Sequence, residues 1–442
     1  MTHSSKLSEL LTASPYQTYV YSYPHKTAYR PLNPPRKLSE VWFRENRDAL
    51  FLYIHIPFCE MRCGFCNLFT MVQKDEDFVS QYIKTLKRQS QQVKQALGTS
   101  NFVRFALGGG TPTRLPLKQL KAVLDIAETV MEADLQSIPC SVEVSPETAT
   151  QDKLNLLRNR GIDRVSIGVQ SFIDGEVLAT QRRQQAQQVK TTLASIKEIG
   201  FSTLNIDLIY GLPGQTIDTW LSSLEQTLSF QPEEIYLYPL YVRPLTGINY
   251  TDKEWDDIRL ICYREGREFL LSQGYQQVSM RMFQKSNPTD IFAPIYCCQT
   301  DGMVGLGCGA RSYTKQLHYA SEYAVGVKGI QAILQTYLNS STELFDYANY
   351  GFNLDTEDLQ RRYILLSLLS NEGLNLKQYH HKFTTELFID YPELKDLLHL
   401  HLATKNGDVI KLNNLGVERS DTIGSWFFSQ KVHQLISQYE LK

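Results

Sequence analysis

Short runs of β-branched and aromatic residues alternate with helical patterns through the first half of the chain. The strand-like runs are bounded by Gly or Pro, and they cover residues 51–57, 103–109, 140–145, 164–170, 203–210 and 234–242. The helical patterns between them cover residues 77–97, 117–131, 151–160, 185–199 and 216–230. Strands that alternate with helices predict an α/β fold, a parallel sheet with its helices outside. Such a sheet can curl into a partial barrel with its active-site groups at the C-terminal strand ends.

The two ends of the 442-residue chain differ from this pattern. Residues 1–50 are aromatic and polar without a clear period, and Pro31, Pro34 and Pro35 break any helix, so we expect an irregular arm packed on the barrel. A helix at 255–273, a strand at 276–283 and a glycine-rich stretch at 296–314 extend the barrel, so that it spans residues 51–345. Residues 346–442 predict a small α+β domain that resembles a winged helix. Its expected elements are helices at 356–371, 376–383 and 394–402, a hairpin of 408–412 and 416–418, and a helix at 423–437.

Three cysteines, Cys59, Cys63 and Cys66, form a C-x3-C-x2-C run just after the first strand. Three thiolates in one tight loop can hold three irons of a [4Fe–4S] cluster. No fourth cysteine follows nearby, so one iron stays open for a small chelating molecule. The amino and carboxylate groups of S-adenosylmethionine (SAM) suit that position. A zinc site or a structural thiol cluster is the alternative, but zinc sites usually pair one C-x2-C with a second, and none follows here.

Glycines and acids stand at the ends of the next strands. Gly108 to Thr111 form a turn whose backbone can approach a ligand closely, and no Gly-Lys-Ser/Thr follows that would make it a P-loop. Glu143 ends the third strand, where a carboxylate can accept hydrogen bonds from a ribose or an ammonium group, or can simply be solvated. Asp207 lies inside an apolar strand, where a carboxylate is costly unless an arginine or a ligand binds it.

Six motifs follow one another in a fixed order: Y-x-H-I-P-F-C, GGGTPT, the strand that contains Glu143, GVQSF, NIDLIYGLP and GLGxGAxSY. Together they resemble the radical SAM superfamily, and within it the branch of the oxygen-independent coproporphyrinogen III oxidases, the HemN-like proteins. The resemblance covers residues 50–315 well and the C-terminal module more loosely. It implies a partial (βα)6 TIM-like barrel, a [4Fe–4S] cluster, two SAM molecules per chain and cleavage of SAM to a 5′-deoxyadenosyl radical.

Carried over residue by residue, the resemblance assigns the three cysteines to the cluster. It implies that the cluster-bound SAM contacts Tyr53, Gly109, Glu143 and Arg311. It implies that the second SAM contacts Phe65, Gly110, Thr111, Gln170, Arg182, Asp207 and Tyr241. The family oxidase usually has other residue types at the places of Tyr241 and Arg311. A further functional cysteine of the oxidase is replaced here by Leu68.

Three functions stay open. The first is oxidative decarboxylation of a tetrapyrrole propionate, of the coproporphyrinogen III oxidase type; candidate cationic clamps for the propionates are Arg182, Arg183, Arg243, Arg281 and Arg311. The second is a radical methyltransferase of another small molecule, which the missing cysteine at position 68 favours. The third is a haem-binding chaperone that would use His25, His55 or His318, and the second SAM set weighs against it. Cys297 and Cys298 could supply a thiol, or be buried or loop thiols without a catalytic role.

Bulk composition excludes some partners. A formal net charge of −2 gives no electrostatic reason to expect binding to nucleic acid or to anionic lipid. The chain has no run of ~18 apolar residues and no apolar signal-peptide core, so we expect no membrane span. An oxygen-sensitive cluster needs a reducing compartment, which favours the cytoplasm. We expect a monomer that takes electrons from a reducing partner such as flavodoxin or ferredoxin.

Overall fold

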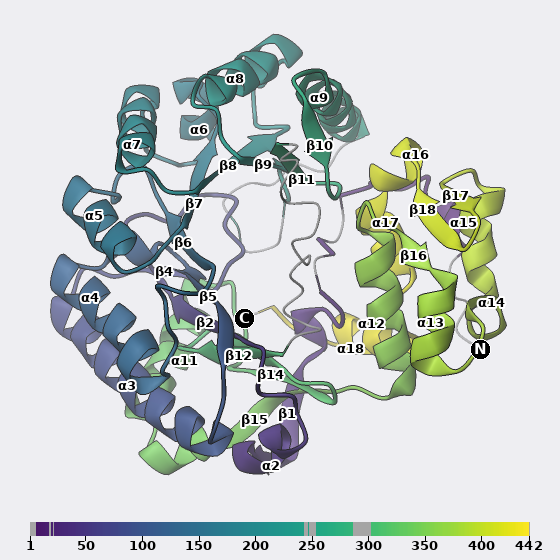
Figure 1. Cartoon of the computed structure of the whole chain (residues 1–442). Coiled ribbons are helices and arrows are strands. Elements are labelled where there is room, and N and C mark those ends of the chain that lie inside the picture. Colours follow the sequence, from purple (N-terminus) through teal and green to yellow (C-terminus); the bar gives the residue numbers. More distant parts are fainter. Residues whose placement is uncertain are drawn as a thin grey trace.

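A curved parallel sheet forms the centre of the protein, and helices cover its outer face (Figure 1). The computed structural model describes residues 6–16, 19–20, 22–242, 246, 253–285 and 302–441. The six predicted strands lie side by side in chain order and pair in parallel: β2 (Leu50–Ile56), β5 (Phe102–Gly109), β6 (Cys140–Val144), β7 (Arg164–Gln170), β8 (Thr203–Tyr210) and β9 (Glu234–Pro239). The α/β partial barrel predicted from the sequence is therefore confirmed.

Helices connect these strands, as the sequence predicts. They are α3 (Glu76–Leu97), α4 (Leu117–Asp125), α5 (Gln151–Asn159), α6 (Asp174–Ala179), α7 (Ala186–Ile199) and α8 (Ile217–Ser229). The π-helical turn Ile126–Val130 continues α4, and the short helix α6 was not predicted. Asp75 and Thr216 explain where α3 and α8 begin, because each side chain accepts a hydrogen bond from a backbone N–H of the first turn.

Side chains alternate along the barrel strands between an outer and an inner face. On the outer face Val165, Ile167, Leu204 and Ile206 are at most 1% exposed and join the main hydrophobic core. The pairing of β7 with β8 sets Val165 beside Leu204 and Ile167 beside Ile206, so the apolar residues form common rows. The residues between them, most of them polar, consequently share the inner face of the barrel.

The sheet continues past the barrel on both sides. Beside β2 lie β12 (Met303–Leu306), β13 (Arg311–Tyr313), β14 (Leu317–Ala320) and β15 (Tyr347–Asn353), with α11 (Val327–Asn339) and the 3-10 helix η4 (Thr342–Asp346) before β15. Beside β9 lie β11 (Met282–Lys285) and β10 (Tyr275–Gln277), which follow α9 (Lys253–Ser272). The single strand expected at 276–283 is wrong, because the backbone N–H groups of Val278 and Ser279 both donate to Met282 O and close a turn there.

The N-terminal arm is more regular than expected. It contains α1 (Leu7–Leu10), η1 (Lys26–Ala28), β1 (Arg30–Lys37) and α2 (Leu38–Phe43), and β1 pairs antiparallel with β15 at the edge of the sheet. Tyr16 and Trp42 join the barrel core, whereas Leu7, Tyr23 and Tyr29 join a second core in the C-terminal domain. The arm therefore contacts both the barrel and the C-terminal domain, and not the barrel alone. The division at residues 50 and 345 stays a prediction.

A small helical domain with a three-stranded sheet ends the chain. Its elements are α12 (Thr356–Leu368), β16 (Leu374–Asn375), α13 (Leu376–Phe383), α14 (Leu387–Asp390), η5 (Pro392–Leu394), α15 (Lys395–His399), β17 (Ala403–Asn406), β18 (Val409–Leu412), α16 (Asn414–Val417), α17 (Ser420–Trp426) and α18 (Gln430–Ser437).

Two predictions for this domain are wrong. The hairpin is formed by β17 and β18 around Gly407, which has a positive φ of 58°, and residues 416–418 are not its second strand. Asn413 instead begins α16, because its side chain accepts a hydrogen bond from Gly416 N at 3.0 Å. The helix expected at 423–437 is divided into α17 and α18, since Ser429 caps α18 by accepting from Val432 N at 3.2 Å.

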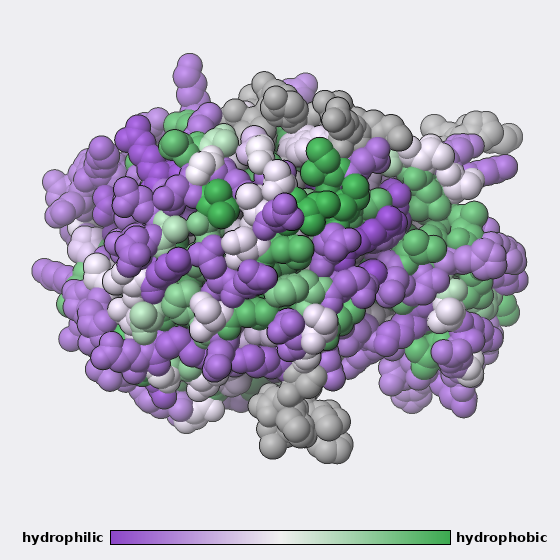
Figure 2. Space-filling view, turned by 90° about the horizontal axis from the view of Figure 1, so that it is seen from above, coloured by the Kyte–Doolittle hydropathy of each residue, from purple (hydrophilic) through white to green (hydrophobic). Residues whose placement is uncertain are grey.

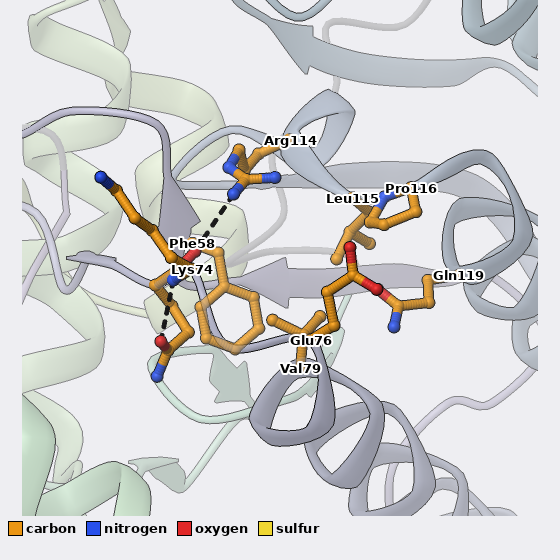
Figure 3. A pocket seen from close by; sticks show the side chains of 9 residues that line it. Phe58, Lys74, Glu76, Val79, Arg114, Leu115, Pro116 and Gln119 are labelled. Atoms are coloured by element: carbon orange, nitrogen blue, oxygen red, sulfur yellow. Dashed lines mark hydrogen bonds between the residues drawn. The ribbon is translucent and has the colours of Figure 1, made fainter.

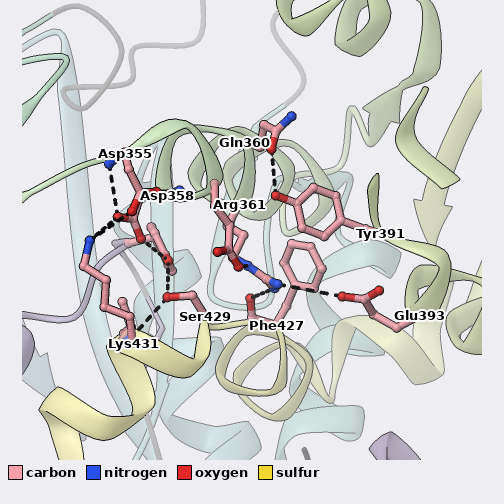
Figure 4. Close-up of polar contacts among 12 residues, drawn as sticks. Asp355, Asp358, Gln360, Arg361, Tyr391, Glu393, Phe427, Ser429 and Lys431 are labelled. Carbon is pink, nitrogen blue, oxygen red and sulfur yellow. Dashed lines mark hydrogen bonds and ion pairs between the residues drawn. The ribbon is translucent and has the colours of Figure 1, made fainter. Parts of the chain in front are cut away.

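Polar contacts hold the arm against the C-terminal domain. The Tyr23 hydroxyl donates to Asp358 at 2.7 Å and lies 3.0 Å from the Ser429 hydroxyl. Figure 4 shows how Lys431 reaches Asp358, with Lys431 Nζ 2.8 Å from that carboxylate. Asp358 is 1% exposed, so this ion pair ties α18 to the first turn of α12. The two Tyr23 contacts join segments that lie more than 300 residues apart in the sequence.

The outer surface is mainly hydrophilic, with hydrophobic side chains gathered mostly in the middle of the face seen in Figure 2. Among the described residues, the large hydrophobic side chains with the highest exposed fractions are Ile389, Phe43 and Leu178, which belong to elements far apart in the chain. Scattered apolar residues of this kind are ordinary on protein surfaces. In the described part of the chain, no helix is both long and apolar enough to span a membrane.

Gly305 in β12 tests the packing of the added strands. A Cβ at this position would lie 2.2 Å from Arg311 O on the paired strand β13. We expect Gly305→Ala to lower the free energy of unfolding by about 2 kcal/mol or more, because the backbone on both sides must shift. Gly175→Ala in α6 is the matched control, since nothing lies within 4 Å of its Cβ. The stabilities of both variants are measured by thermal and urea denaturation. Equal stabilities would contradict this packing.

Candidate functional site

The inner faces of the barrel strands enclose a polar cavity of about 200 Å³. Its lining side chains come from every central strand and include Tyr53, Ser141, Glu143, Arg164, Ser166, Asn205, Asp207, Tyr236 and Tyr238. Such a polar interior is unusual, because each buried polar group must find a hydrogen-bond partner. The cavity has room for several water molecules or for part of a small ligand.

Glu143 reaches this cavity from the end of β6. Its Oε2 accepts a hydrogen bond from Gly109 N at 2.9 Å, and a Cβ on Gly108 would lie 2.9 Å from the same carboxylate. The pKa of Glu143 is raised to about 7, mainly by burial; the Gly109 hydrogen bond opposes this rise, and the nearby charge of Asp207 adds to it. The side chain is nevertheless open to the cavity, so water or a polar ligand can reach it.

Asp207 faces the same cavity from β8. It accepts hydrogen bonds from Asn205 Nδ2 at 2.8 Å and from the Ser166 hydroxyl at 3.4 Å. Burial raises the pKa of Asp207 to about 6, although Asn205 and the charge of Arg164 lower it. Arg164 forms its ion pair with Glu234, 2.6 Å away, so the arginine partner considered from the sequence binds another carboxylate. Asp207 therefore keeps a carboxylate oxygen that a ligand in the cavity can approach.

Several lining residues were missed from the sequence. Arg164, Asn205, Tyr236 and Tyr238 lie on the inner face of the barrel, and Asn205 Oδ1 is buried without a hydrogen-bond partner among the described residues. The signal that could have found them is the two-residue period of polar side chains, which places them on the same face as Glu143 and Asp207.

The cysteine loop lies directly against the glycine turn after β5. A Cβ on Gly110 would lie 2.7 Å from Phe58 O and 2.8 Å from Cys59 Sγ. Thr111 N donates to Phe58 O at 2.8 Å, and the Thr111 hydroxyl lies 3.8 Å from Cys59 Sγ. Only a glycine fits this approach, which explains why the turn needs its glycines at positions 109 and 110. The same turn thus contacts both the cysteine loop and Glu143.

Arg182 connects the cysteine loop to β7. Its Nη1 donates to Cys63 Sγ at 3.4 Å and its Nη2 to Gly168 O at 2.7 Å. Gln170, at the end of β7, has a positive φ of 70° beside an irregularity in the pairing with β8, and its side chain folds back against Gly168. Bulges and strained residues of this kind re-aim side chains next to active sites. The structure thus brings Arg182 and Gln170 together beside the cysteines.

The three cysteines suit a [4Fe–4S] cluster. Burial and, to a smaller extent, the neighbouring Cys66 raise the pKa of Cys59 to about 12, so the thiolates need a positively charged centre. In the described part of the chain, no three His, Cys, Asp or Glu side chains meet around one point that could hold a single metal ion. A cube does not require this, since each thiolate binds a different iron. The donor set fits a cluster with three protein ligands.

Phe65 and Tyr241 lie at the mouth of the barrel in different settings. Phe65 packs against a small apolar cluster that includes Ile209 and Leu240, at the ends of β8 and β9. Tyr241 is 9% exposed, and its hydroxyl bonds to Asp421 of the C-terminal domain and to Arg281. The Tyr241 hydroxyl is therefore bonded within the protein, and the contact of Tyr241 with a second SAM stays a prediction.

The proposed cationic clamps are in part already engaged. Arg281 is buried on Asp421, and Arg182 contacts Cys63. Arg311 lies beside the Tyr313 ring, 5.9 Å from its centroid, and its charge lowers the pKa of His55. Arg183 is exposed. Arg243, Cys297 and Cys298 lie outside the described residues.

The histidines considered as haem ligands are bound within the protein. His55 is buried, with Nε2 3.0 Å from Phe69 O and Nδ1 3.1 Å from the Tyr53 hydroxyl. His318 is completely buried and accepts from Arg362 Nη1 at 2.7 Å. His25 Nδ1 lies 2.7 Å from the Thr27 hydroxyl and caps η1. Burial lowers the pKa of both His55 and His318, so both rings are neutral and packed in the fold.

A second hollow lies outside the barrel, between α3 and the start of α4 (Figure 3). Its volume is about 10 Å³, and Arg114 closes one side by donating to Gln73 O at 3.3 Å. This space suits one water molecule and no organic ligand. The barrel cavity is consequently the candidate site.

Comparisons with known proteins agree with this geometry. Residues 53–227 match the radical SAM superfamily. The chain is 27% identical over 426 residues to the oxygen-independent coproporphyrinogen III oxidase of Helicobacter pylori strain J99, which covers 91% of this chain and 90% of that protein. It is 26% identical over 372 residues to the heme chaperone HemW of Bacillus subtilis, covering 82% and 95%. The solved structure of coproporphyrinogen III oxidase (HemN) from Escherichia coli, described as a radical SAM enzyme, superposes with a TM-score of 0.79 at 25% identity, covering 93% of this chain and 97% of that one. By these comparisons the chain resembles the radical SAM superfamily over residues 53–227, and it is similar along most of its length to HemN-like proteins.

Proposed function

We propose that this protein is a radical SAM enzyme that acts on a tetrapyrrole, with oxidative decarboxylation of a propionate side chain as its reaction. The observation that carries the proposal is the placement of Glu143 and Asp207 in one cavity, beside the turn that contacts the cysteine loop. Similarity to the oxygen-independent coproporphyrinogen III oxidases along nine-tenths of the chain supports it.

The superfamily implies a [4Fe–4S] cluster and SAM. In our proposal Cys59, Cys63 and Cys66 hold the cluster, and two SAM molecules bind above the barrel. The first lies among Tyr53, Gly109, Glu143 and Arg311. The second lies among Phe65, Gly110, Thr111, Gln170, Arg182, Asp207 and Tyr241. Because Gly109 N already donates to Glu143, the turn holds this carboxylate in place for a ligand.

When bound, a reduced cluster and SAM would supply methionine and a 5′-deoxyadenosyl radical. The radical would take a β-hydrogen atom of the propionate as 5′-deoxyadenosine, and the substrate radical would then pass one electron to an acceptor, release CO2 and become a vinyl group. The residues of the barrel orient the reactants. Glu143 and Asp207 offer negative charge to the ammonium, sulfonium and ribose groups of SAM. Phe65 and the apolar cluster around it exclude water from the mouth. A flavodoxin or ferredoxin would supply the electrons, and we propose that the chain acts as a monomer.

One observation favours a second candidate, a HemN-like methyltransferase in which the second SAM supplies the transferred carbon. Leu68 is 50% exposed and lies two residues beyond Cys66, where the family oxidase carries a functional cysteine. An apolar side chain cannot donate a proton or a hydrogen atom as a thiol can. A haem chaperone is less well supported, because His55 and His318 are buried and bonded within the protein.

Product analysis separates these functions. The protein is reconstituted anaerobically with iron and sulfide, reduced, and incubated with SAM in the presence and absence of coproporphyrinogen III. We expect about four irons per chain, 5′-deoxyadenosine, and a vinyl product seen by mass spectrometry. Cys63→Ala should lose the cluster and all products, whereas Cys262→Ala, buried and distant from the loop in sequence, should keep both. A methylated product would favour the methyltransferase, and deoxyadenosine without a changed tetrapyrrole would contradict the oxidase.

Asp207→Asn tests the second SAM. The substitution keeps the shape of the side chain and removes its charge, so we expect the affinity for the second SAM to fall about ten- to a hundred-fold. The first SAM should be little affected. Equilibrium dialysis of the reconstituted protein counts the sites and gives both affinities. Asp163→Asn is the control, because Asp163 lies just before β7 and is not among the residues that line the cavity; its carboxylate instead accepts a hydrogen bond from Cys140 N at 3.0 Å. One SAM per wild-type chain, unchanged in the variant, would contradict the second site.

The pKa of Glu143 predicts how pH acts on the first SAM. Since a proton competes with SAM for this carboxylate, affinity should fall by up to about tenfold for each pH unit below about 7. Above that value the carboxylate is ionised and affinity should level off. Anaerobic calorimetric titration between pH 5.5 and 8.5 measures the profile. Glu143→Gln should bind more weakly at pH 8 and show a flatter profile; a slope equal to that of the wild type would assign the pH effect to another group.

A further inference from the structure

Asp421 joins the three parts of the molecule at one buried point. It lies near the start of α17 in the C-terminal domain and is 1% exposed. Arg281, beside β11 on the barrel side, places Nη2 2.6 and 2.7 Å from the two carboxylate oxygens. Val20 N of the arm donates to Oδ1 at 3.0 Å, and the Tyr241 hydroxyl, just beyond β9, donates to Oδ2. One carboxylate thus accepts hydrogen bonds from the arm and from the rim of the barrel.

Aromatic rings lead from this carboxylate to the cavity. The Tyr241 ring stacks on Tyr19 of the arm, with centroids 5.6 Å apart and planes at 18°. Tyr19 meets Tyr238 edge to face at 6.2 Å, and Tyr238 lines the cavity beside Asp207. The Arg281 guanidinium lies 4.2 Å from the centroid of the Tyr19 ring, where a cation is attracted to the ring face. The position of Asp421 therefore determines the position of two tyrosines next to the candidate site.

Burying an ion pair at this position is energetically unfavourable. Arg281 is 7% exposed, and burying two charges costs solvation free energy that their mutual attraction only partly restores. Apolar residues of similar volume often pack at least as stably, so stability alone does not explain the pair. The pair instead fixes geometry, because hydrogen bonds are directional. The carboxylate holds the guanidinium, the tyrosine hydroxyl and the arm amide in defined positions. Such fixed geometry is useful where a wall of a binding site must be held in place.

We propose that Asp421 is a positioning residue for the second SAM. It holds Tyr241 and the arm residue Tyr19 against Tyr238, and this fixed aromatic wall sets the shape of the cavity mouth on the side of Asp207. Docking of the arm and of the C-terminal domain on the barrel is then required for full affinity at that site. The proposal rests on the proposed function, because it presumes that a second SAM binds beside Asp207.

Asp421→Asn tests the proposal, with Glu418→Gln as the matched control. Glu418 also joins the C-terminal domain to the barrel, through Arg264 of α9 at 2.6 and 2.8 Å, and it is 3% exposed. Among the described residues, the hydrogen bonds of the Glu418 side chain go to Arg264 and to neither the arm nor Tyr241. Both variants therefore lose one buried carboxylate charge at the same interface. Tyr241→Phe is a milder second variant that removes only the hydroxyl bonded to Asp421, in case Asp421→Asn fails to fold.

Two measurements on the reconstituted full-length chain decide the outcome. In equilibrium dialysis with SAM, Asp421→Asn should weaken the second site about tenfold or more and Tyr241→Phe severalfold, with the first site unchanged in both. In hydrogen–deuterium exchange, arm peptides that contain Val20 should exchange several times faster in Asp421→Asn. Glu418→Gln should change neither result.

Equal weakening of both SAM sites, or an equal effect of Glu418→Gln, would make Asp421 a merely structural contact and overturn the proposal. Wild-type affinity at the second site in Tyr241→Phe and in folded Asp421→Asn would do the same. The proposed function fails separately, if the wild type itself binds one SAM. The count of sites in the wild type and the difference between variants thus report on the two proposals independently.

Discussion

The register of the parallel strands is the constraint on which the rest of the site depends. β6 pairs with β7 so that Glu143 lies beside Ser166, and β7 pairs with β8 so that Gly168 lies beside Asp207. Side chains alternate between the faces of a strand, so a slip of one residue would move a carboxylate out of the barrel and an apolar side chain into it. The apolar rows under the helices prevent that slip. The hydrophobic core therefore specifies the place of the polar residues, although it contacts no ligand.

The same arrangement buries polar and ionisable side chains inside the barrel, which costs free energy. Burial raises the pKa of both Glu143 and Asp207, and each raised value means that the folded chain holds the ionised carboxylate less favourably than water does. Asn205 Oδ1 is buried without a partner among the described residues. A positively charged ligand with hydroxyl groups would relieve these costs when it binds. Ligand binding can thus remove unfavourable interactions that are present in the free protein, and this adds to the affinity. Functional sites often have perturbed pKa values for this reason.

The sequence predicted the barrel strands closely because their signal is local. Runs of β-branched residues between Gly and Pro depend on neighbours only a few positions away, as in β7 and β8. The expectation that active-site groups gather at strand ends needed only the parallel topology, and it stays a prediction. Glu143 lies near the end of β6 and Asp207 lies inside β8, and both line the same cavity. Asn413 shows the limit of such reasoning, since asparagine favours both turns and helix N-caps. The predicted hairpin of 408–412 and 416–418 places Asn413 in its turn, but this residue caps a helix. The earlier Asn406-Gly407 pair was the better signal for the hairpin.

Contacts between distant segments escaped prediction for a different reason. The sequence around residues 19–20 and 281 does not indicate that these segments lie at Asp421. Such contacts depend on how the arm, the barrel and the C-terminal domain pack together once each has folded. Arg281, a candidate propionate clamp, binds that carboxylate, and the hydroxyl of Tyr241, a candidate SAM contact, donates to it as well. Both side chains therefore have a partner within the protein that the sequence did not indicate. In our proposal these contacts support a wall of the site, so residue identity at an aligned position is a weaker guide to contact than the charge placed opposite it.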